Sequence, residues 1–286
     1  MQTEKTRPLP LIAAEMRRLM LEAVYRAASG HIGGSLSIAE LLAVLYWREL
    51  RIDPKNPGDP GRDRMVLSKG HCSPALYAAL AMRGYFPVED LNGFRRIDSY
   101  LSGHVEMRHV PGVDMSAGSL GQGFSAAIGM ALASILDNKD LRVYVILGDG
   151  ELQEGQIWEA AMSASHYKLD NLVVIVDNND LQISGRLENV LSPYPIGKKF
   201  EAFGFHVVEI DGHDLNQIES AFTRARAVNC KPSCIVAKTI KGKGVSFMEN
   251  NAGWHGSPPN VEQYEAARDE LDAVIAVLEK EAKENA

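Results

Sequence analysis

The apolar positions along this chain switch between helical spacing and short continuous runs. From Leu11 to Ala28 the apolar side chains recur at helical spacing until Ser29-Gly30, which predicts a first helix that ends there. Short apolar runs bounded by polar residues or glycine are typical of buried parallel strands. Such runs predict five strands, at Met65–Leu67, Val143–Leu147, Leu172–Val176, Val207–Ile210 and Ser233–Ala237.

Helical patterns lie between the later strands, over Gln153–Tyr167 and Leu215–Val228. Alternation of strand, helix and strand implies right-handed crossovers within one sheet. We therefore expect an α/β fold, with a doubly wound, mostly parallel sheet that carries helices on both faces. In such a sheet, ligands bind in the loops beyond the carboxyl ends of the strands.

The remaining segments predict further helices around this sheet. Ser35-Leu36-Ser37 has the composition of an N-cap before the apolar run Ile38–Tyr46, and the Pro/Gly-rich stretch Asp53–Gly61 predicts a surface loop. We expect a single domain over residues 1–286, with its core at about 11–257 and a docked terminal helix at about 261–283. Other helical patterns are Pro74–Arg83, Val88–Arg96, Phe124–Leu136 and Val261–Lys283.

Composition and charge narrow the class of protein. The chain has 286 residues, 45% hydrophobic and 23% charged, which is typical of a packed globular core. A net charge of −7 without a long Lys/Arg cluster argues against a nucleic-acid partner. No run approaches the roughly 18 apolar residues of a membrane span, and the first ten residues lack a secretory apolar region. Three cysteines without a CxxC motif favour a reducing compartment, so we expect a cytoplasmic protein.

Polar residues follow two neighbouring predicted strands. Gly148-Asp149-Gly150 comes directly after one strand, and Asp177-Asn178-Asn179 ends the next. A Gly-Asp-Gly tripeptide alone is most often a turn. Adjacent parallel strands, however, would bring Asp149 and Asn179 to the same edge of the sheet, about 5 Å apart in strand spacing. One carboxylate, one amide oxygen and a backbone carbonyl are too few ligands for Ca²⁺ but suit Mg²⁺ completed by phosphate and water, so a phosphorylated cofactor is predicted.

Glycine-rich and basic loops give weaker signals. The segment Gly118–Gly123 precedes a predicted helix and could cradle phosphate through backbone N–H groups, or its glycines could serve close helix packing. It fits neither a P-loop nor a dinucleotide fingerprint. The run Lys241–Gly244 could likewise contact phosphate or form a solvated loop. Cys72 has no assigned base and no nucleophile elbow, so we do not expect a catalytic thiol.

Histidines concentrate beside glycines in this sequence. Five of the eight histidines adjoin a glycine, more than the one or two that chance would supply. Imidazoles on such loops can share proton transfer near neutral pH, although each alone is more often a capping or surface histidine. We favour the capping interpretation for His213, in an Asp-Gly-His-Asp turn. The five are His31, His71, His104, His213 and His255.

Taken in order, these motifs resemble transketolase, over about residues 11–257. The likeness is strongest to the amino-terminal subunit of a split, two-chain transketolase, in which the thiamine-diphosphate-binding half is a separate polypeptide. The matching segments are Ser29-Gly30-His31, Asp63-Arg64, Leu67-Ser68-Lys69-Gly70-His71, Gly103-His104, Pro111-Gly112-Val113, Gly118–Gly123, Gly148-Asp149-Gly150-Glu151, Asp177-Asn178-Asn179 and Trp254-His255-Gly256.

The resemblance implies thiamine diphosphate and Mg²⁺ as cofactors, and it implies which residues bind them. Asp149, Asn179 and the backbone carbonyl of Leu181 would hold the metal, which anchors the diphosphate. The resemblance also implies that Glu154 belongs to the cofactor site and joins a carboxylate network across the subunit interface. The other residues implied to contact the cofactor are His71, Gly118, Leu120, Gly150 and Asn179.

The resemblance also implies the reaction, which is transfer of a two-carbon ketol unit from a ketose phosphate to an aldose phosphate. His31 and His255 would serve proton transfer at the substrate oxygens, and His104 would hold the terminal hydroxyl of the donor. The carboxylate that activates the cofactor belongs, in the family, to a second α/β domain, for which the roughly 50 residues after Ala237 are too few. We therefore expect a carboxyl-terminal partner subunit, in a two-plus-two heterotetramer.

This sequence departs from the family at three positions. Ile32 and Ser119 replace common prolines, and Asp180 stands where a small glycine often follows the metal-binding asparagine. The expected consequence of Asp180 is an additional carboxylate near the metal, which would disturb the geometry at Leu181.

Other functions remain open at this point. A subunit of deoxyxylulose-phosphate synthase or of a 2-oxoacid dehydrogenase would keep the cofactor and change the reaction, but those families lack the full set of Gly-His sites. A non-catalytic cofactor-binding subunit is the third possibility, and the intact histidines argue against it. Pentose phosphates are the most common substrates of the family, yet branched or sulfonated sugars would leave this half of the enzyme much the same.

Overall fold

Five parallel strands form the central sheet of the computed structural model, which describes residues 7–284. Their order is β1-β2-β3-β7-β6, and every neighbouring pair is parallel. All five strands predicted from the sequence are present, and the predicted α/β fold class is confirmed. The bounds are β1 Arg64–Leu67, β2 Val143–Gly148, β3 Leu172–Asn178, β6 His206–Asp211 and β7 Ser233–Lys238.

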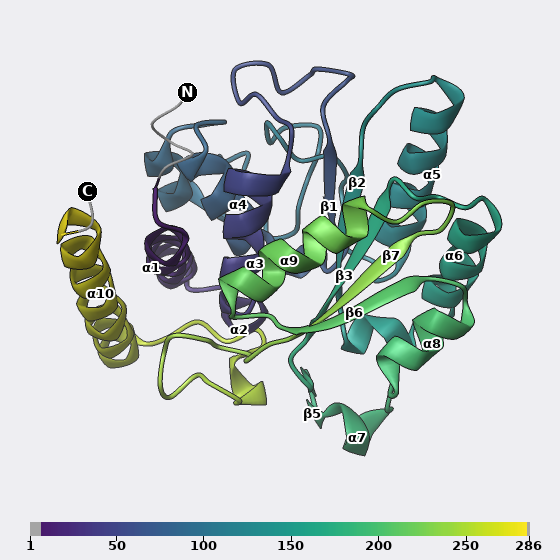
Figure 1. The fold of residues 1–286 in the computed structure, drawn as a ribbon. Helices are drawn as coiled ribbons and strands as arrows, with labels where there is room; N and C mark the ends of the chain where they lie inside the picture. Colours follow the sequence, from purple (N-terminus) through teal and green to yellow (C-terminus); the bar gives the residue numbers. More distant parts are fainter. Residues whose placement is uncertain (1–6, 285–286) are drawn as a thin grey trace.

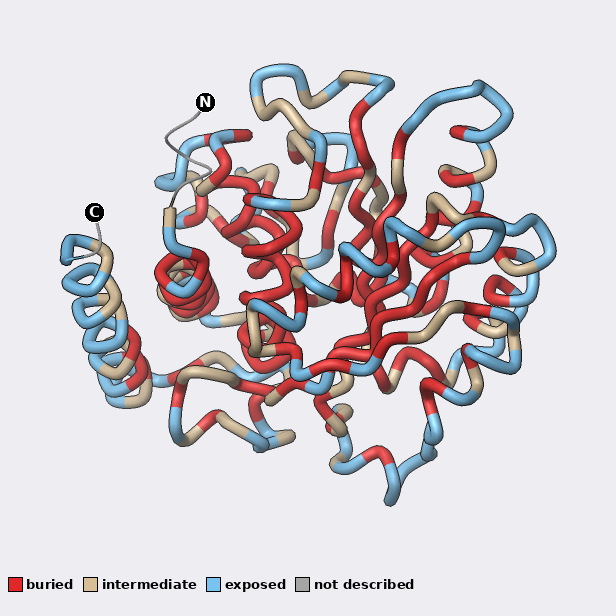
Figure 2. Tube along the Cα trace, viewed as in Figure 1, coloured by how far each residue is buried: buried red, intermediate tan, exposed pale blue. Residues whose placement is uncertain are grey.

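Helices cover both faces of the sheet because successive strand residues alternate between two apolar layers (Figure 1). In β3, Val173 and Ile175 belong to one layer, while Leu172, Val174 and Val176 belong to the other. Figure 2 shows that the inner strands β2, β3 and β7 are buried along most of their length, whereas the edge strand β6 is buried only in part and the outer sides of the helices are exposed. One layer contains α1 Leu9–Ala27, α3 Ala39–Val44, α4 Ser73–Met82 and α9 Leu215–Arg226, and the other contains α5 Gln122–Leu136, α6 Gly155–His166 and α8 Ile196–Ala202.

The segment before the first strand differs from its prediction. A short helix α2 (Ile32–Leu36) precedes α3, and a π-helical turn (Leu45–Glu49) follows it. The predicted N-cap at Ser35–Ser37 is wrong, since Ile38 occupies the N-cap position of α3 without a side-chain hydrogen bond. The hydroxyl of Ser37 instead donates to the buried carboxylate of Asp177 at 2.8 Å, and it also lies 3.0 Å from the Gly34 carbonyl.

Two other helix predictions also need correction. The predicted helix Val88–Arg96 is only a 3₁₀ segment, Val88–Gly93, after which Arg95 adopts a positive φ of 60° that no helix continues through. The pattern over Gln153–Tyr167 divides into a 3₁₀ turn, Gly150–Gln153, and helix α6, because Glu154 has extended backbone. Helix α8 was not predicted; its seven residues are too few to show helical periodicity.

The terminal helix α10, Val261–Glu284, packs along α1 as predicted (Figure 1). The rings of Tyr25 and Tyr264 stack with centroids 3.8 Å apart, and Arg18 pairs with Asp272 at 3.0 Å. Beyond Leu271 no residue of α10 up to Glu284 is buried. No helix among residues 7–284 is both long enough and apolar enough to cross a bilayer.

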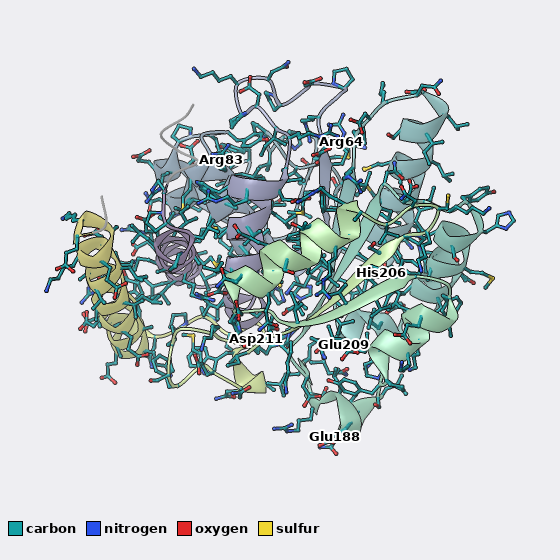
Figure 3. All side chains as sticks on the ribbon, viewed as in Figure 1. Arg64, Arg83, Glu188, His206, Glu209 and Asp211 are labelled. Atoms are coloured by element: carbon teal, nitrogen blue, oxygen red, sulfur yellow. The ribbon has the colours of Figure 1, made fainter. Side chains whose placement is uncertain are left out.

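The strands all end on one side, which we call the carboxyl edge of the sheet. In Figure 3, Arg64, the first residue of β1, lies toward the top of the view, and Asp211, the last residue of β6, lies lower down, on the side of the carboxyl edge. Beyond the carboxyl edge lies a small antiparallel hairpin, β4 (Leu181–Gln182) and β5 (Gly185–Arg186), followed by the short helix α7 (Leu187–Val190).

The buried strand layer should dominate the stability of this fold. We expect Ile175→Ala, in the middle of β3 and fully buried, to lower the free energy of unfolding by about 2–5 kcal/mol, because it leaves a cavity in the apolar layer that Ile175 shares with Val173. Denaturant titration of the purified chain measures the change. Ile97→Ala is the matched control, since Ile97 is fully exposed and the same truncation there should change stability by less than about 0.5 kcal/mol. Equal effects at the two positions would contradict this assignment of the core.

Candidate functional site at the carboxyl edge of the sheet

The two motifs predicted to face each other do lie on adjacent strands. Gly148, at the end of β2, is the register partner of Asp177 on β3. One residue later, the backbone N–H of Asp149 donates to the carbonyl of Asp177 at 3.2 Å. Asp149 and Asn179 are both buried, and both line the same cavity at the carboxyl edge. The spacing argument therefore placed these two side chains correctly.

Asp149 is a buried carboxylate without a cation of its own. Its Oδ1 accepts the N–H of Gly150 at 2.8 Å, and its Oδ2 accepts the N–H of Asp180 at 2.5 Å. Within residues 7–284 no lysine, arginine or histidine forms an ion pair with it. Burial, together with the neighbouring charge of Asp177, raises the pKa of Asp149 to about 7. The folded chain therefore holds a carboxylate that a bound cation would stabilise.

Asp177, by contrast, is fully compensated. Lys69 donates to its Oδ2 at 2.5 Å, and the amide Nδ2 of Asn179 donates to the same oxygen at 2.9 Å. Ser37 and Thr239 supply two further hydroxyl donors. Burial alone would raise the pKa of Asp177, but Lys69 and these hydrogen bonds lower it, so Asp177 stays ionised. Because the amide N–H₂ of Asn179 donates to Asp177, its Oδ1 is the end of the amide that can act as a ligand, and as an acceptor of two bonds it keeps one lone pair beside its hydrogen bond from Leu181.

Two further oxygen donors lie near Asp149, the side-chain oxygen of Asn179 and the carbonyl of Leu181, and together the three supply only part of the ligands of a divalent cation. Asn179 Oδ1 accepts the N–H of Leu181 at 3.2 Å, and the carbonyl of Leu181 accepts the ammonium of Lys241 at 3.0 Å. Among the described residues there is no cluster of three or more His, Cys, Asp or Glu side chains that could hold a metal. With Asp149, these oxygens make a sparse set, which suits Mg²⁺ that takes its other ligands from phosphate and water.

Four imidazoles face one another beside this oxygen set. The ring of His31 lies 5.1 Å from His71, 5.3 Å from His255 and 5.9 Å from His104, measured between centroids. His71 and His255 are 5.2 Å apart. The sequence could indicate that these histidines sit on loops but not that their four loops converge.

All four imidazoles are held neutral at pH 7. Burial, followed by neighbouring positive charge, lowers the pKa of His31 and His71 to about 4 and that of His255 to about 3. The pKa of His104 is lowered by burial and by His71 and Arg95. A neutral imidazole offers one donor and one acceptor, so each ring can either give or take a proton at a bound hydroxyl or carbonyl.

The glycine-rich loop before α5 serves packing and lines the cavity at once. Gly121 has φ +85°, and a Cβ at Gly123 would lie 2.7 Å from the Cα of Ser68, so both positions require glycine. Gly118 and Leu120 contribute to the cavity wall. The buried carboxylate of Glu151 ties this loop to β2, because it accepts the N–H groups of Gly121 and Gly148, each at 2.9 Å.

Every residue predicted for the site lines one cavity of about 390 Å³. Glu154, in the wall of this cavity, is exposed. The structure thus brings together all the residues that the sequence predicts for the site. They are His31, His71, His104, Gly118, Leu120, Asp149, Gly150, Glu154, Asn179, Leu181 and His255.

Two lysines of the cavity were missed or left undecided by the sequence. Lys69 is the second residue after β1, so a search of the residues that follow each strand, which identified Asp149 after β2, would have found it. Lys241 is 2% exposed and reaches the cavity, so it does not belong to a solvated loop, whereas Lys243 pairs with Glu249 at 3.3 Å. Burial lowers the pKa of Lys241, and its ammonium also lies 3.1 Å from Nδ1 of His255.

The remaining candidates have structural explanations. His213 joins three segments, since its Nδ1 lies 3.0 Å from Glu40 and its Nε2 accepts the N–H of Ile240 at 2.9 Å. Cys72 is fully buried, and burial raises the pKa of its thiol, in agreement with the prediction that it is not catalytic.

Asp180 does not add a carboxylate to the cavity, contrary to expectation. Its Oδ2 pairs with Arg186 at 2.8 Å and its Oδ1 lies 3.0 Å from the hydroxyl of Tyr194. The φ of Asp180 is +64°, which explains why glycine is common at this position and turns the side chain away from Asp149.

Comparison with known proteins agrees with the geometry. The family model described as transketolase, thiamine diphosphate binding domain, matches residues 10–274. The chain is 51% identical to the 6-deoxy-6-sulfo-D-fructose transketolase subunit of Clostridium sp. (strain MSTE9), covering 93% of this chain and 94% of that one. It is 44% identical to an apulose-4-phosphate transketolase subunit of Phocaeicola vulgatus, covering 96% and 97%.

Solved structures show the same fold within longer proteins. The transketolase of Leishmania mexicana superposes with a TM-score of 0.86 at 31% identity, and that of Campylobacter jejuni with 0.85 at 35%. The chain spans less than half the length of these proteins, 46% and 45%, although they cover 97% and 94% of it. The family predicted from the sequence motifs is thus confirmed, and thiamine diphosphate is the cofactor of that family's domain. This chain belongs to the transketolase family, as a thiamine-diphosphate-binding domain of the length found in its separate-subunit members.

Proposed function

We propose that this chain is the catalytic half-subunit of a transketolase, active with a carboxyl-terminal partner subunit. It would transfer a two-carbon ketol unit from a ketose phosphate to an aldose phosphate, with thiamine diphosphate and Mg²⁺. The observation that carries the proposal is the convergence, in one cavity, of an uncompensated carboxylate, Asp149, with four neutral imidazoles. We propose a single domain over the whole chain, working in the cytoplasm, where its three free cysteines would stay reduced.

The residues at the ends of β2 and β3 would hold the metal. Asp149, Asn179 Oδ1 and the Leu181 carbonyl are the oxygen donors, and Asp177 orients the amide of Asn179 by holding its N–H₂ group. Gly150 and His71 line the cavity beside them and are suited to contact the diphosphate, while Gly118 and Leu120 form the wall suited to the aminopyrimidine. Lys241 would supply positive charge to the diphosphate.

The chemistry divides between the cofactor and the histidines. Thiamine diphosphate, when bound, supplies the thiazolium ring that holds the electron pair released as the carbon–carbon bond of the sugar breaks. His31 and His255 would move protons at the substrate oxygens, which a neutral imidazole can do in either direction. His104, exposed toward the opening of the cavity, would hold the terminal hydroxyl of the donor.

A partner subunit is supported by two observations. The relatives that match over nearly their whole length are named as subunits, and full-length transketolases are about twice as long as this chain. Glu154 lines the cavity and is exposed, so a partner could reach it. We propose a two-plus-two heterotetramer in which Glu154 joins a carboxylate network across the interface.

The substrate is proposed as a ketose that carries an anionic group. The names of the two similar subunits specify 6-deoxy-6-sulfo-D-fructose and apulose 4-phosphate, and each of these sugars carries an anionic group. The 51% identity to the first makes a sugar sulfonate the alternative to a sugar phosphate. Comparing kcat/KM for fructose 6-phosphate and 6-deoxy-6-sulfofructose in the reconstituted complex decides between them.

Replacing Asp149 should separate cofactor binding from stability. Because its pKa is raised above the unfolded value of 3.8, ionised Asp149 destabilises the folded chain, and the penalty grows as pH rises toward 7. We expect Asp149→Asn to raise the melting temperature of the cofactor-free chain at pH 8 by roughly 2–5 °C, and to abolish Mg²⁺-dependent binding of thiamine diphosphate to the complex. Thermal unfolding and calorimetric titration measure the two effects.

The control for this substitution is the neighbouring carboxylate. Asp180→Asn should leave cofactor binding unchanged, since Asp180 faces Arg186 rather than the cavity. At pH 4 the stability difference between Asp149→Asn and the wild type should vanish, because the wild-type carboxyl is then protonated. Retention of metal-dependent cofactor binding by Asp149→Asn would exclude the proposed metal site.

The purified chain alone should show negligible ketol transfer, and activity should appear when a carboxyl-terminal transketolase subunit is added. Without that subunit the cavity is open and lacks the activating carboxylate that the family places on the second domain. Release of aldose from a ketose phosphate, followed by a coupled assay, measures the reaction. Full turnover by this chain without any partner would refute the half-subunit proposal.

In the reconstituted complex, His104→Ala should reduce kcat/KM by about 10- to 100-fold, because it removes one hydrogen bond to the terminal hydroxyl of the donor. His166→Ala, at the exposed end of α6, is the control and should leave kcat/KM unchanged. An unchanged kcat/KM in His104→Ala would instead favour a non-catalytic, cofactor-binding role for this chain.

A further inference from the structure

One guanidinium connects the two loops that carry His31 and His104. Arg95 Nη1 donates to the hydroxyl of Ser29 at 2.6 Å, two residues before His31. Its Nη2 donates to the carbonyl of Gly103 at 3.3 Å, one residue before His104. Arg95 itself is not among the residues that line the cavity, so it acts from behind the two imidazoles.

The backbone around Arg95 leaves just enough room for its guanidinium to reach both loops. Arg95 has φ +60°, and its N–H donates to the carbonyl of Leu101 at 2.8 Å, which fixes the start of the side chain. A Cβ at Gly103 would lie 2.3 Å from Nε of Arg95, so only glycine leaves room for the guanidinium. On the other side, Gly30 has φ +147° and a Cβ there would lie 3.2 Å from the ring of Phe94.

The charge of Arg95 is not neutralised by the chain. Within residues 7–284 no carboxylate pairs with Arg95, and its buried Nε has no hydrogen-bond acceptor. Burial lowers its pKa, yet an arginine stays protonated at any physiological pH. An unpaired cation at this position disfavours a second positive charge on either neighbouring imidazole.

We propose that Arg95 is a positioning residue of the site: it ties the His31 loop to the His104 loop and keeps both imidazoles uncharged. The link sets the separation of the two rings at 5.9 Å. The inference rests on the proposed function only for its catalytic consequence, since the link and the charge are properties of this chain alone.

Other groups act on the same histidines and must be distinguished from Arg95. His31 faces His71, His104 and His255, with the cation of Lys241 as well as that of Arg95. His104 faces His31, His71 and Arg95. Lys241 acts also on His71 and His255, for which Arg95 is not a leading cause of the lowered pKa. Loss of Arg95 should therefore change the pKa values of His31 and His104 and leave those of His71 and His255 unchanged.

The direct test is a pH titration of the histidine ring signals by NMR in the full-length chain, with no partner needed. In Arg95→Gln the pKa of His31 and that of His104 should rise, while those of His71 and His255 stay at their wild-type values. Arg96→Gln is the matched control, because Arg96 is the exposed neighbour and should change none of the four. Absence of a rise at His31 and His104, or equal rises at all four, would overturn the proposal.

The catalytic consequence is tested in the reconstituted complex. Arg95→Gln should lower kcat/KM by about ten- to a hundredfold, because displacing reacting groups by about 1 Å has effects of that size. Its affinity for thiamine diphosphate and Mg²⁺ should equal that of the wild type, since Arg95 contacts none of the proposed metal ligands. Loss of cofactor affinity in parallel with rate would show a general structural role and contradict the proposal.

Two further variants keep the test decisive. Ser29→Ala removes one hydrogen bond of the link and leaves the cation, so it should lower kcat/KM without raising either pKa. Arg95→Lys keeps the cation if Arg95→Gln does not fold, and its two histidines should titrate as in the wild type while the rate still falls. If the wild-type complex transfers no ketol unit at all, the proposed function fails, and the NMR titration still decides the role of Arg95.

Discussion

The carboxylate of Asp177 is the interaction on which the site depends. It lies at the end of β3, fully buried, and accepts hydrogen bonds from four segments of the chain. An ionised carboxylate at such a position is tolerated only because its partners satisfy it, and losing one would leave a buried charge unpaired. The donors come from the turn between α2 and α3, from the ends of β1 and β7, and from Asn179.

The same ion pair decides how charge is distributed at the carboxyl edge. Lys69 is paired with Asp177, so Asp149, one strand away, has no cation and is destabilised by burial and by Asp177 itself. The two buried carboxylates thus differ in role: Asp177 is paired with Lys69, whereas Asp149 has no cationic partner among the described residues and can bind a metal ion. This division follows from the environments of the two groups and not from their residue type, which is the same.

The sequence was sufficient for the sheet and for most residues of the site, but not where a long-range contact overrides a local preference. Strands such as Val143–Leu147 are buried on both faces, so their apolar runs are unambiguous, and Asp149 follows directly from where one run ends. Ser37 has the composition of an N-cap, but the buried Asp177 takes its hydroxyl, because an unsatisfied carboxylate is more costly than an uncapped helix end. Arg95 carries no signal in the sequence, since only tertiary contacts show that this cation lies behind the cavity.

Two cations, one in the wall of the cavity and one behind it, act together with the neutral histidines. Lys241 and Arg95 have no carboxylate partner within residues 7–284, and each lies beside an imidazole whose pKa is lowered. Uncompensated positive charge attracts a diphosphate, and it also prevents protonation of the rings that must accept protons. A cavity with ordinary salt bridges at these two positions would lose both properties, since each carboxylate added would weaken the attraction for the cofactor and favour imidazolium.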